Sequence, residues 1–174
     1  MKKRWIIWLV MALMLLGGCQ EPVYETIADE PAVPAAVQCR QILVSLPENA
    51  AVPTAEQTGV GNIYECDGFT LTIQTLDAGD LDKTLQTLTG YHRDELQIIE
   101  SVKDGFKRYD SVFTAAGEGS LQVGRVCILD DGEYHYAVTT LAPEQTVGQV
   151  RSAWEDIYAT FRLVDADMDL NTGS

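Results

Sequence analysis

Basic residues are scarce in this 174-residue chain, which has 12 Lys and Arg against 26 Asp and Glu and a formal net charge of −14. Lys2, Lys3 and Arg4 are the only charged residues among the first eighteen. Without these three, nine basic residues face 26 acids and the net charge falls to −17. Because so acidic a surface repels phosphate backbones, the composition excludes nucleic acid as a partner.

Histidine and cysteine are also rare, with two and four residues. Their scarcity leaves little material for a metal centre or a nucleophile–base pair, and we expect neither a metal nor another cofactor. His92 lies beside Asp94 and Glu95. This group is typical of a solvated turn rather than a zinc site.

Cys127 and His135 are the remaining candidates for a nucleophile and its base. A two-residue turn at Asp131-Gly132 predicts that Ile128 pairs with His135 and that Cys127 pairs with Tyr136. Successive side chains of a strand point to opposite faces, so this register places Cys127 and His135 on opposite sides of the sheet. We therefore expect no catalytic dyad.

The N-terminus carries the most specific motif. After the basic residues 2–4, Trp5–Leu16 is an uninterrupted apolar run of twelve residues. As a helix it spans roughly 18 Å, short of the roughly 30 Å core of a bilayer, which favours a signal peptide over a transmembrane helix. The run ends in Leu16-Gly17-Gly18-Cys19. This motif resembles the lipobox of bacterial lipoproteins, whereas the alternative is an ordinary secretory signal that contains a cysteine.

The resemblance implies cleavage between Gly18 and Cys19 and a diacylglyceryl group on the Cys19 sulfur. Such a protein is anchored in the lipid bilayer, on the outer face of the cytoplasmic membrane, or in the outer membrane where the organism has one.

Four segments follow from these patterns. Residues 1–18 are the signal peptide, and residues 19–37 are the lipidated N-terminus and an acidic tether that contains three prolines. The alternative for part of the tether is a first strand at Val23–Ile27. Residues 38–165 form one globular domain, since a hydrophobic fraction of 46% is too high for a disordered chain. Residues 166–174 are a disordered acidic tail; the stretch Asp165–Asn171, most of which lies in this tail, starts like an EF-hand loop but has Leu170 where the loop requires glycine.

Three Asp-Gly pairs, at residues 67–68, 104–105 and 131–132, predict hairpins between apolar or alternating runs. The first predicts that Cys66 pairs with Phe69 and Tyr64 with Leu71. The other expected strands are Arg40–Leu46, Leu96–Val102, Phe106–Ala116, Leu121–Leu129 and Glu133–Leu141.

Two helices interrupt the strands. The first begins at the N-cap Asp80 and ends at Gly90. Thr146 and Gln149 fit a capping box for the second. Its apolar stripe has helical spacing and must dock on a sheet; it comprises Val147, Val150, Trp154, Ile157, Tyr158 and Phe161.

The expected fold class is α+β, a mainly antiparallel sheet of about six or seven strands in the order β-β-β-α-β-β-β-β-α. This order resembles the PsbP/Mog1-like α/β/α sandwich and the small bacterial lipoproteins that carry such domains. The resemblance covers residues 38–164 and implies a fold, not an activity.

Three cysteines remain after Cys19, so at most one disulfide forms between them. The favoured pair is Cys39–Cys66, because both are expected on strands of the first half of the sheet. The alternative is that both are free thiols, as buried cysteines commonly are.

The sequence favours a non-catalytic binding or accessory role for an extracytoplasmic lipoprotein. Envelope proteins, small ligands or cationic ligands are the expected partners, with association that weakens in salt. The alternative is an envelope hydrolase or transferase with a carboxylate-based site.

Overall fold

The computed structural model describes residues 39–51, 61–117 and 119–165, which lie in the second of two compact units, Val37–Ser174. The signal peptide, the tether, Cys19 and the acidic tail lie outside the described residues. In chain order the helices and strands are β1 (Gln41–Leu43), β2 (Asn62–Cys66), β3 (Phe69–Asp77), α2 (Leu81–Thr89), the short 3₁₀ helix η2 (Arg93–Glu95), β4 (Ile98–Lys103), β5 (Phe106–Ala116), β6 (Leu121–Asp130), β7 (Tyr134–Pro143), α3 (Val147–Thr160) and β8 (Arg162–Val164).

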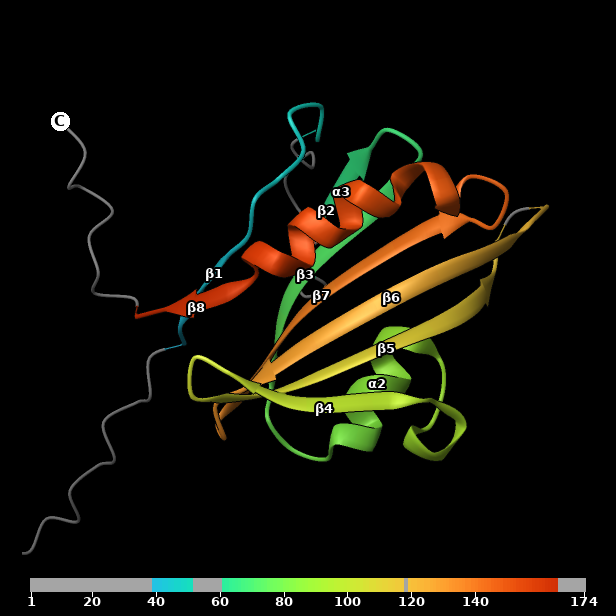
Figure 1. The fold of residues 1–174 in the computed structure, drawn as a ribbon. Coiled ribbons are helices and arrows are strands. Elements are labelled where there is room, and N and C mark those ends of the chain that lie inside the picture. Colours follow the sequence, from blue (N-terminus) through green and yellow to red (C-terminus); the bar gives the residue numbers. More distant parts are fainter. Residues whose placement is uncertain (1–38, 52–60, 118, 166–174) are drawn as a thin grey trace, which may run out of the picture. The chain divides into compact units, whose positions relative to one another are not determined.

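Six of the strands form one antiparallel sheet in the order β2-β3-β7-β6-β5-β4 (Figure 1). β1 and β8 form a separate two-stranded sheet. The expected order of elements is confirmed. Two short elements were not predicted: the 3₁₀ helix η2, and β8, three residues that follow α3 after Phe161.

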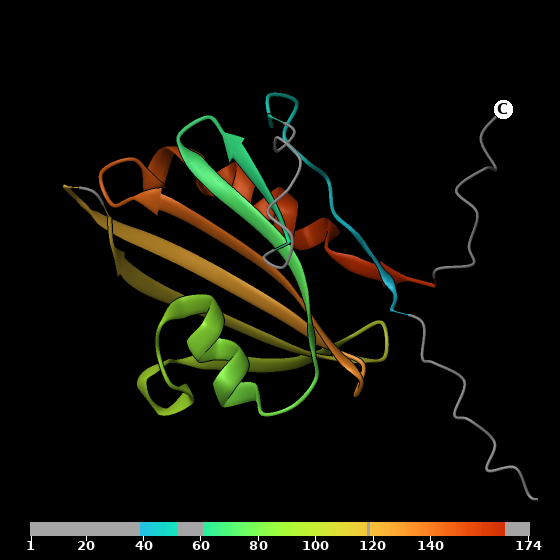
Figure 2. The same ribbon diagram turned by 180° about the vertical axis from the view of Figure 1, so that it is seen from behind.

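The two long helices cover opposite faces of the six-stranded sheet, as the two views in Figures 1 and 2 show. α3 covers the face that presents Leu71, Cys127 and Val138. α2 covers the face that presents Val126, Ile128 and Ala137. Two separate apolar cores result, one on each face, and the α+β fold class is confirmed.

The first Asp-Gly hairpin has the predicted register, and the second forms as expected. Cys66 pairs with Phe69, and Tyr64 pairs with Leu71. In the second hairpin Lys103 pairs with Phe106, and both turn residues have positive φ, 53° at Asp104 and 87° at Gly105. These values are those of a type I′ turn, which explains the Asp-Gly sequence.

The third hairpin is shifted by two residues from the predicted register. Asp130 pairs with His135, and Leu129 pairs with Tyr136. The cause is Asp131, whose carboxylate accepts hydrogen bonds from the backbone N–H groups of Glu133 and Tyr134 at 3.0 and 2.8 Å. Asp131 therefore precedes the turn instead of occupying its first central position.

The first strand was placed in the wrong sheet. Only Gln41–Leu43 of the expected Arg40–Leu46 strand is paired, and its partner is β8. The edge of β2 is partly occupied by Ala51, whose backbone N–H donates to the carbonyl of Glu65 at 3.0 Å. β1 has no partner in the larger sheet. It pairs instead with β8, which follows α3 in the chain.

Polar contacts fix the start of β1 against the β6–β7 turn. The backbone N–H of Arg40 donates to the Tyr136 hydroxyl at 2.9 Å, and that hydroxyl donates to Asp131 at 2.9 Å. The Arg40 guanidinium lies 5.0 Å from the centre of the Phe106 ring. These contacts hold the two-stranded sheet beside the end of the larger one.

The ends of α2 match the sequence prediction, whereas the start of α3 does not. The Asp80 side chain accepts from the backbone N–H of Asp82 at 3.0 Å, and Gly90 ends the helix with φ of 83°. Thr146 makes no side-chain capping bond; its hydroxyl donates to the carbonyl of Pro143 instead. The predicted capping box is therefore wrong, although the helix forms.

Trp154 lies where the apolar stripe predicts, buried between α3 and the sheet. Its side chain is 6% exposed and meets the Phe69 ring edge-on, with 6.3 Å between ring centres. The buried indole Nε1 has no hydrogen-bond partner among the described residues. The contribution of Trp154 to stability is therefore apolar packing.

Trp154→Ala should lower the free energy of unfolding by about 3–5 kcal/mol, because it removes a large side chain from a filled core. The measurement is urea unfolding followed by circular dichroism. Trp154→Phe is the control and should cost clearly less, since it retains an aromatic ring and removes an N–H that has no partner. A loss under about 1 kcal/mol for Trp154→Ala would contradict the packing argument.

Candidate functional site

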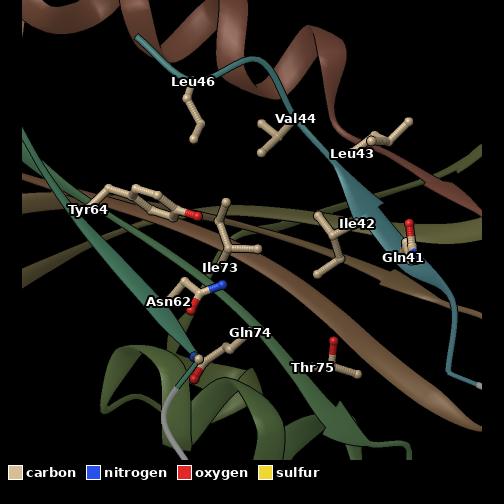
Figure 3. A pocket seen from close by; sticks show the side chains of 11 residues that line it. Gln41, Ile42, Leu43, Val44, Leu46, Asn62, Tyr64, Ile73, Gln74 and Thr75 are labelled. Atoms are coloured by element: carbon tan, nitrogen blue, oxygen red, sulfur yellow. The ribbon is translucent and has the colours of Figure 1, made fainter. Parts of the chain in front are cut away.

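An apolar groove of about 470 Å³ lies beside the β2 edge of the six-stranded sheet (Figure 3). One wall is the segment Gln41–Leu46, which contains β1, and the other is formed by β2 and β3. Figure 3 shows Leu46 and Tyr64 at one end of the groove and Gln41 and Thr75 at the other.

Gly61 shapes the edge on which the groove lies. Its φ is +84°, and a Cβ added there would lie 2.3 Å from the carbonyl oxygen of Ile73. Only glycine fits this close approach with a positive φ, and β2 begins at the next residue, Asn62. β3 extends further, to Asp77, and Gln74 and Thr75 line the groove beyond the start of β2.

The lining is apolar in its walls and uncharged throughout. Ile42, Val44 and Leu46 alternate along one wall, and Tyr64 and Ile73 face them from the other. Asn62, Gln74 and Thr75 supply the polar groups. Apolar walls with a few polar groups, in a volume of this size, are typical of sites that bind small ligands or single extended segments.

A second candidate is a cluster of charges on the α3 side of the sheet. Asp110 accepts hydrogen bonds from Arg108 at 2.6 and 3.1 Å and from Arg125 at 3.0 Å. The Arg125 guanidinium lies 4.1 Å from the centre of the Tyr158 ring, and the Tyr158 hydroxyl donates to the carbonyl of Arg125 at 2.6 Å. The cluster thus joins β5 and β6 to the C-terminal half of α3, which is a structural role.

The three described cysteines are all free thiols. Cys39 is exposed and precedes β1, whereas Cys66 lies in β2 of the larger sheet. The premise that both belong to one half of a single sheet is therefore wrong, and the Cys39–Cys66 disulfide is not formed in the structure. Burial and the neighbouring carboxylate of Glu65 raise the pKa of Cys66.

Cys127 and His135 lie on opposite faces of the sheet, as predicted. The two-residue shift in register does not affect this result, because the side-chain alternation has a period of two. Cys127 is buried under α3, where burial and Asp110 raise the pKa of its thiol to about 12. A nucleophilic cysteine needs a lowered pKa instead.

His135 has a structural role that the sequence did not indicate. Its Nδ1 lies 2.7 Å from the Thr84 hydroxyl, so a buried hydrogen bond links α2 to β7. Burial lowers the pKa of His135, which keeps the ring neutral at pH 7. Thr84 carried no signal in the sequence because its partner is 51 residues away.

His92 lies in an exposed turn, as expected. Its Nδ1 is 3.0 Å from Asp82, and its backbone N–H donates to Glu95 at 2.7 Å. The hydrogen bond to Asp82 raises the pKa of His92, while hydrogen bonds from the backbone N–H of Arg93 and from the His92 ring lower the pKa of Asp82. No group of three potential metal ligands occurs within the described residues.

Among the helices of residues 39–51, 61–117 and 119–165, none is long and apolar enough to cross a bilayer. No protein-family model matches the sequence, and no curated protein matches it.

Solved structures do share the fold. Cyanobacterial PsbP (CyanoP) from Synechocystis matches with a TM-score of 0.52 and 10% identity, over 75% of this chain and 96% of that one. LpqN, involved in cell envelope biogenesis of Mycobacterium tuberculosis, matches with a TM-score of 0.51 and 12% identity, over 72% of this chain and 84% of that one. These likenesses confirm the PsbP/Mog1-like fold and show nothing further.

The groove itself was not predicted. The strand expected at Arg40–Leu46 was assigned to the larger sheet, whereas the observed β1 pairs with β8 and forms one wall of the groove. Gly61 was the one residue in the sequence that could have indicated the groove. A single glycine, however, does not reveal which other part of the chain lies close to it.

Gly61→Ala tests how the edge is shaped. The added Cβ would overlap the carbonyl of Ile73, so we expect it to lower the free energy of unfolding by about 1–3 kcal/mol more than Gly119→Ala does. Gly119 has the same φ of +84° and open space around the added atom, so it reports backbone strain alone. Equal losses in urea unfolding would show that the contact with Ile73 does not constrain the edge.

Asp110→Asn tests the charge cluster. Burial opposes ionisation of Asp110, but the hydrogen bonds from Arg108 and Arg125 outweigh it and lower its pKa. The carboxylate therefore stabilises the fold fully above the unfolded pKa of 3.8, and this contribution is lost as pH falls through the lower folded value. We expect Asp110→Asn to cost about 2 kcal/mol at pH 7.

We expect the difference in the free energy of unfolding between Asp110→Asn and the unsubstituted protein to become smaller when urea unfolding is measured at pH values below 3.8. Asp104→Asn is the matched control at an exposed turn and should cost little at pH 7. A pH-independent difference for Asp110→Asn would contradict the ionic role.

Proposed function

We propose that the protein is a lipoprotein, anchored outside the cytoplasm, whose folded domain acts by binding and without chemistry of its own. The observation that carries this proposal is the order of a basic segment, the apolar run Trp5–Leu16 and the motif Leu16-Gly17-Gly18-Cys19. Two acyl chains, at about 0.8 kcal/mol per buried CH₂, are enough for a durable anchor at Cys19.

The tether would set how far the domain acts from the bilayer. Residues 20–37 contain three prolines, four acids and no Lys or Arg, and such a chain stays extended over roughly 50 Å. Its negative charge would keep it away from anionic lipid. The domain is thus placed to meet proteins or ligands near the membrane surface.

The groove supports the binding part of the proposal, because it combines apolar walls with a few polar groups. The likeness in fold to LpqN, which is involved in cell envelope biogenesis, is consistent with a place in the envelope.

The alternative is a hydrolase or transferase with a carboxylate-based site. A carboxyl group that acts as a general acid near pH 7 needs a raised pKa. The described carboxylates with shifted pKa values are Asp82, Asp110 and Asp131, and each is lowered. These three groups give the alternative no support.

Cys19→Ala should abolish incorporation of an alkyne-labelled fatty acid and release the protein from the membrane fraction, because it removes the sulfur that carries the lipid. Cys39→Ala is the matched control, since it removes a cysteine outside the motif, and it should change neither result. An intact mass that shows an unmodified N-terminal Cys19, or cleavage at another bond, would overturn the proposal.

A further inference from the structure

Among the described residues, no strand pairs with the outer edge of β3 beyond Ile73, where the groove lies. β2 pairs with β3 only as far as Ile73, whereas β3 continues to Asp77 and pairs with β7 along that length. On the groove side, no described residue pairs with Gln74–Asp77. The backbone N–H and C=O groups on such an edge are a template for a further strand.

The opposite wall suits an extended chain. Gln41–Leu46 is six residues long and spans at most roughly 20 Å. Its alternate side chains Ile42, Val44 and Leu46 point towards the groove in Figure 3. A strand laid along this wall would place alternate side chains among these apolar groups, which is how strand addition combines affinity with specificity.

The charges near the groove determine which extended segments it would bind. The lining is uncharged, but an exposed acid follows it at each end: Glu48 lies two residues beyond Leu46, and Asp77 lies two residues beyond Thr75. The cation next to Gln41, Arg40, is paired with Asp131 and Asp165. The whole chain carries a net charge of −14. These charges favour an apolar segment flanked by Lys or Arg, whereas the chain's own tether has four acids and no basic residue.

We propose that the groove binds an extended polypeptide segment, apolar at alternate positions and flanked by basic residues, which adds a strand to the outer edge of β3 beyond Ile73. This inference rests on the proposed binding function and names its ligand class.

The probe is the fluorescein-labelled peptide Lys-Val-Thr-Val-Thr-Val-Lys, titrated with the full chain in detergent and followed by fluorescence anisotropy. Two versions carry N-methyl groups, one on the three valines and one on the two threonines. Alternate residues of a strand point their N–H groups to opposite edges, so strand addition requires that at least one version binds at least tenfold more weakly. Tight binding of both versions would overturn strand addition, as would no binding of the unmethylated peptide at millimolar protein.

Thr75→Trp tests the location, because Thr75 is an exposed residue of the groove and a large ring there fills its end. It should weaken binding at least tenfold. Val112→Trp, at a 61% exposed position of β5, is the matched control and should leave binding unchanged. Unaltered binding to Thr75→Trp would overturn the assignment to this groove.

A fourth peptide, with Glu in place of both Lys residues, tests the charge requirement and should bind at least tenfold more weakly than the unmethylated probe; equal binding would overturn that requirement. The assay in detergent does not depend on the lipid at Cys19. Failure of strand addition is therefore distinct from failure of the anchored binding role, which the Cys19→Ala experiment tests.

Discussion

The two central strands of the sheet, β6 and β7, are apolar on both faces, and this constraint shapes the rest of the domain. Residues 126–129 of β6 and 135–138 of β7 are consecutively buried. Side chains alternate along a strand, so neither face of this central region can be left to water. At least one helix is needed on each face to bury these side chains. The chain provides α2 before the second half of the sheet and α3 after it. The charge cluster and the Thr84–His135 hydrogen bond then fix where each helix lies.

The same arrangement leaves the sheet edge incomplete. A helix on each face protects the centre, but it does not require all strands to have equal length. Among the described residues, β2 begins at Asn62 opposite Ile73, directly after Gly61, whereas β3 continues to Asp77. β1 does not fill the space, since its partner is β8. Two local features therefore shape the groove: the close approach of Gly61 to β3, which only glycine permits, and the pairing of β1 with β8.

The part of the fold that the sequence predicted is the part encoded by neighbouring residues. The Asp-Gly turns, the N-cap Asp80 and the apolar stripe of α3 each need only a few adjacent positions. The register error at the third hairpin did not alter which face Cys127 occupies, because a shift of two preserves the alternation. The errors concern choices between distant partners. The pattern of β1 predicts a strand but cannot name β8 as its neighbour, and the groove, which depends on that choice, could not be predicted either.

The anchor and the groove place opposite demands on charge, and the sequence meets both. If Cys19 carries the lipid, the domain works beside a surface that is commonly anionic, and the net charge of −17 that remains without residues 1–18 keeps it from lying flat there. The same charge would repel acidic partners, so the groove can be apolar and uncharged without binding every extended segment nearby. Tethering raises the local concentration of the domain at the membrane, so modest affinity per encounter suffices for partners held in the same envelope. The acidic domain would therefore raise the rate at which segments with flanking basic residues encounter the groove. The uncharged, apolar lining would then select those whose alternate side chains are apolar.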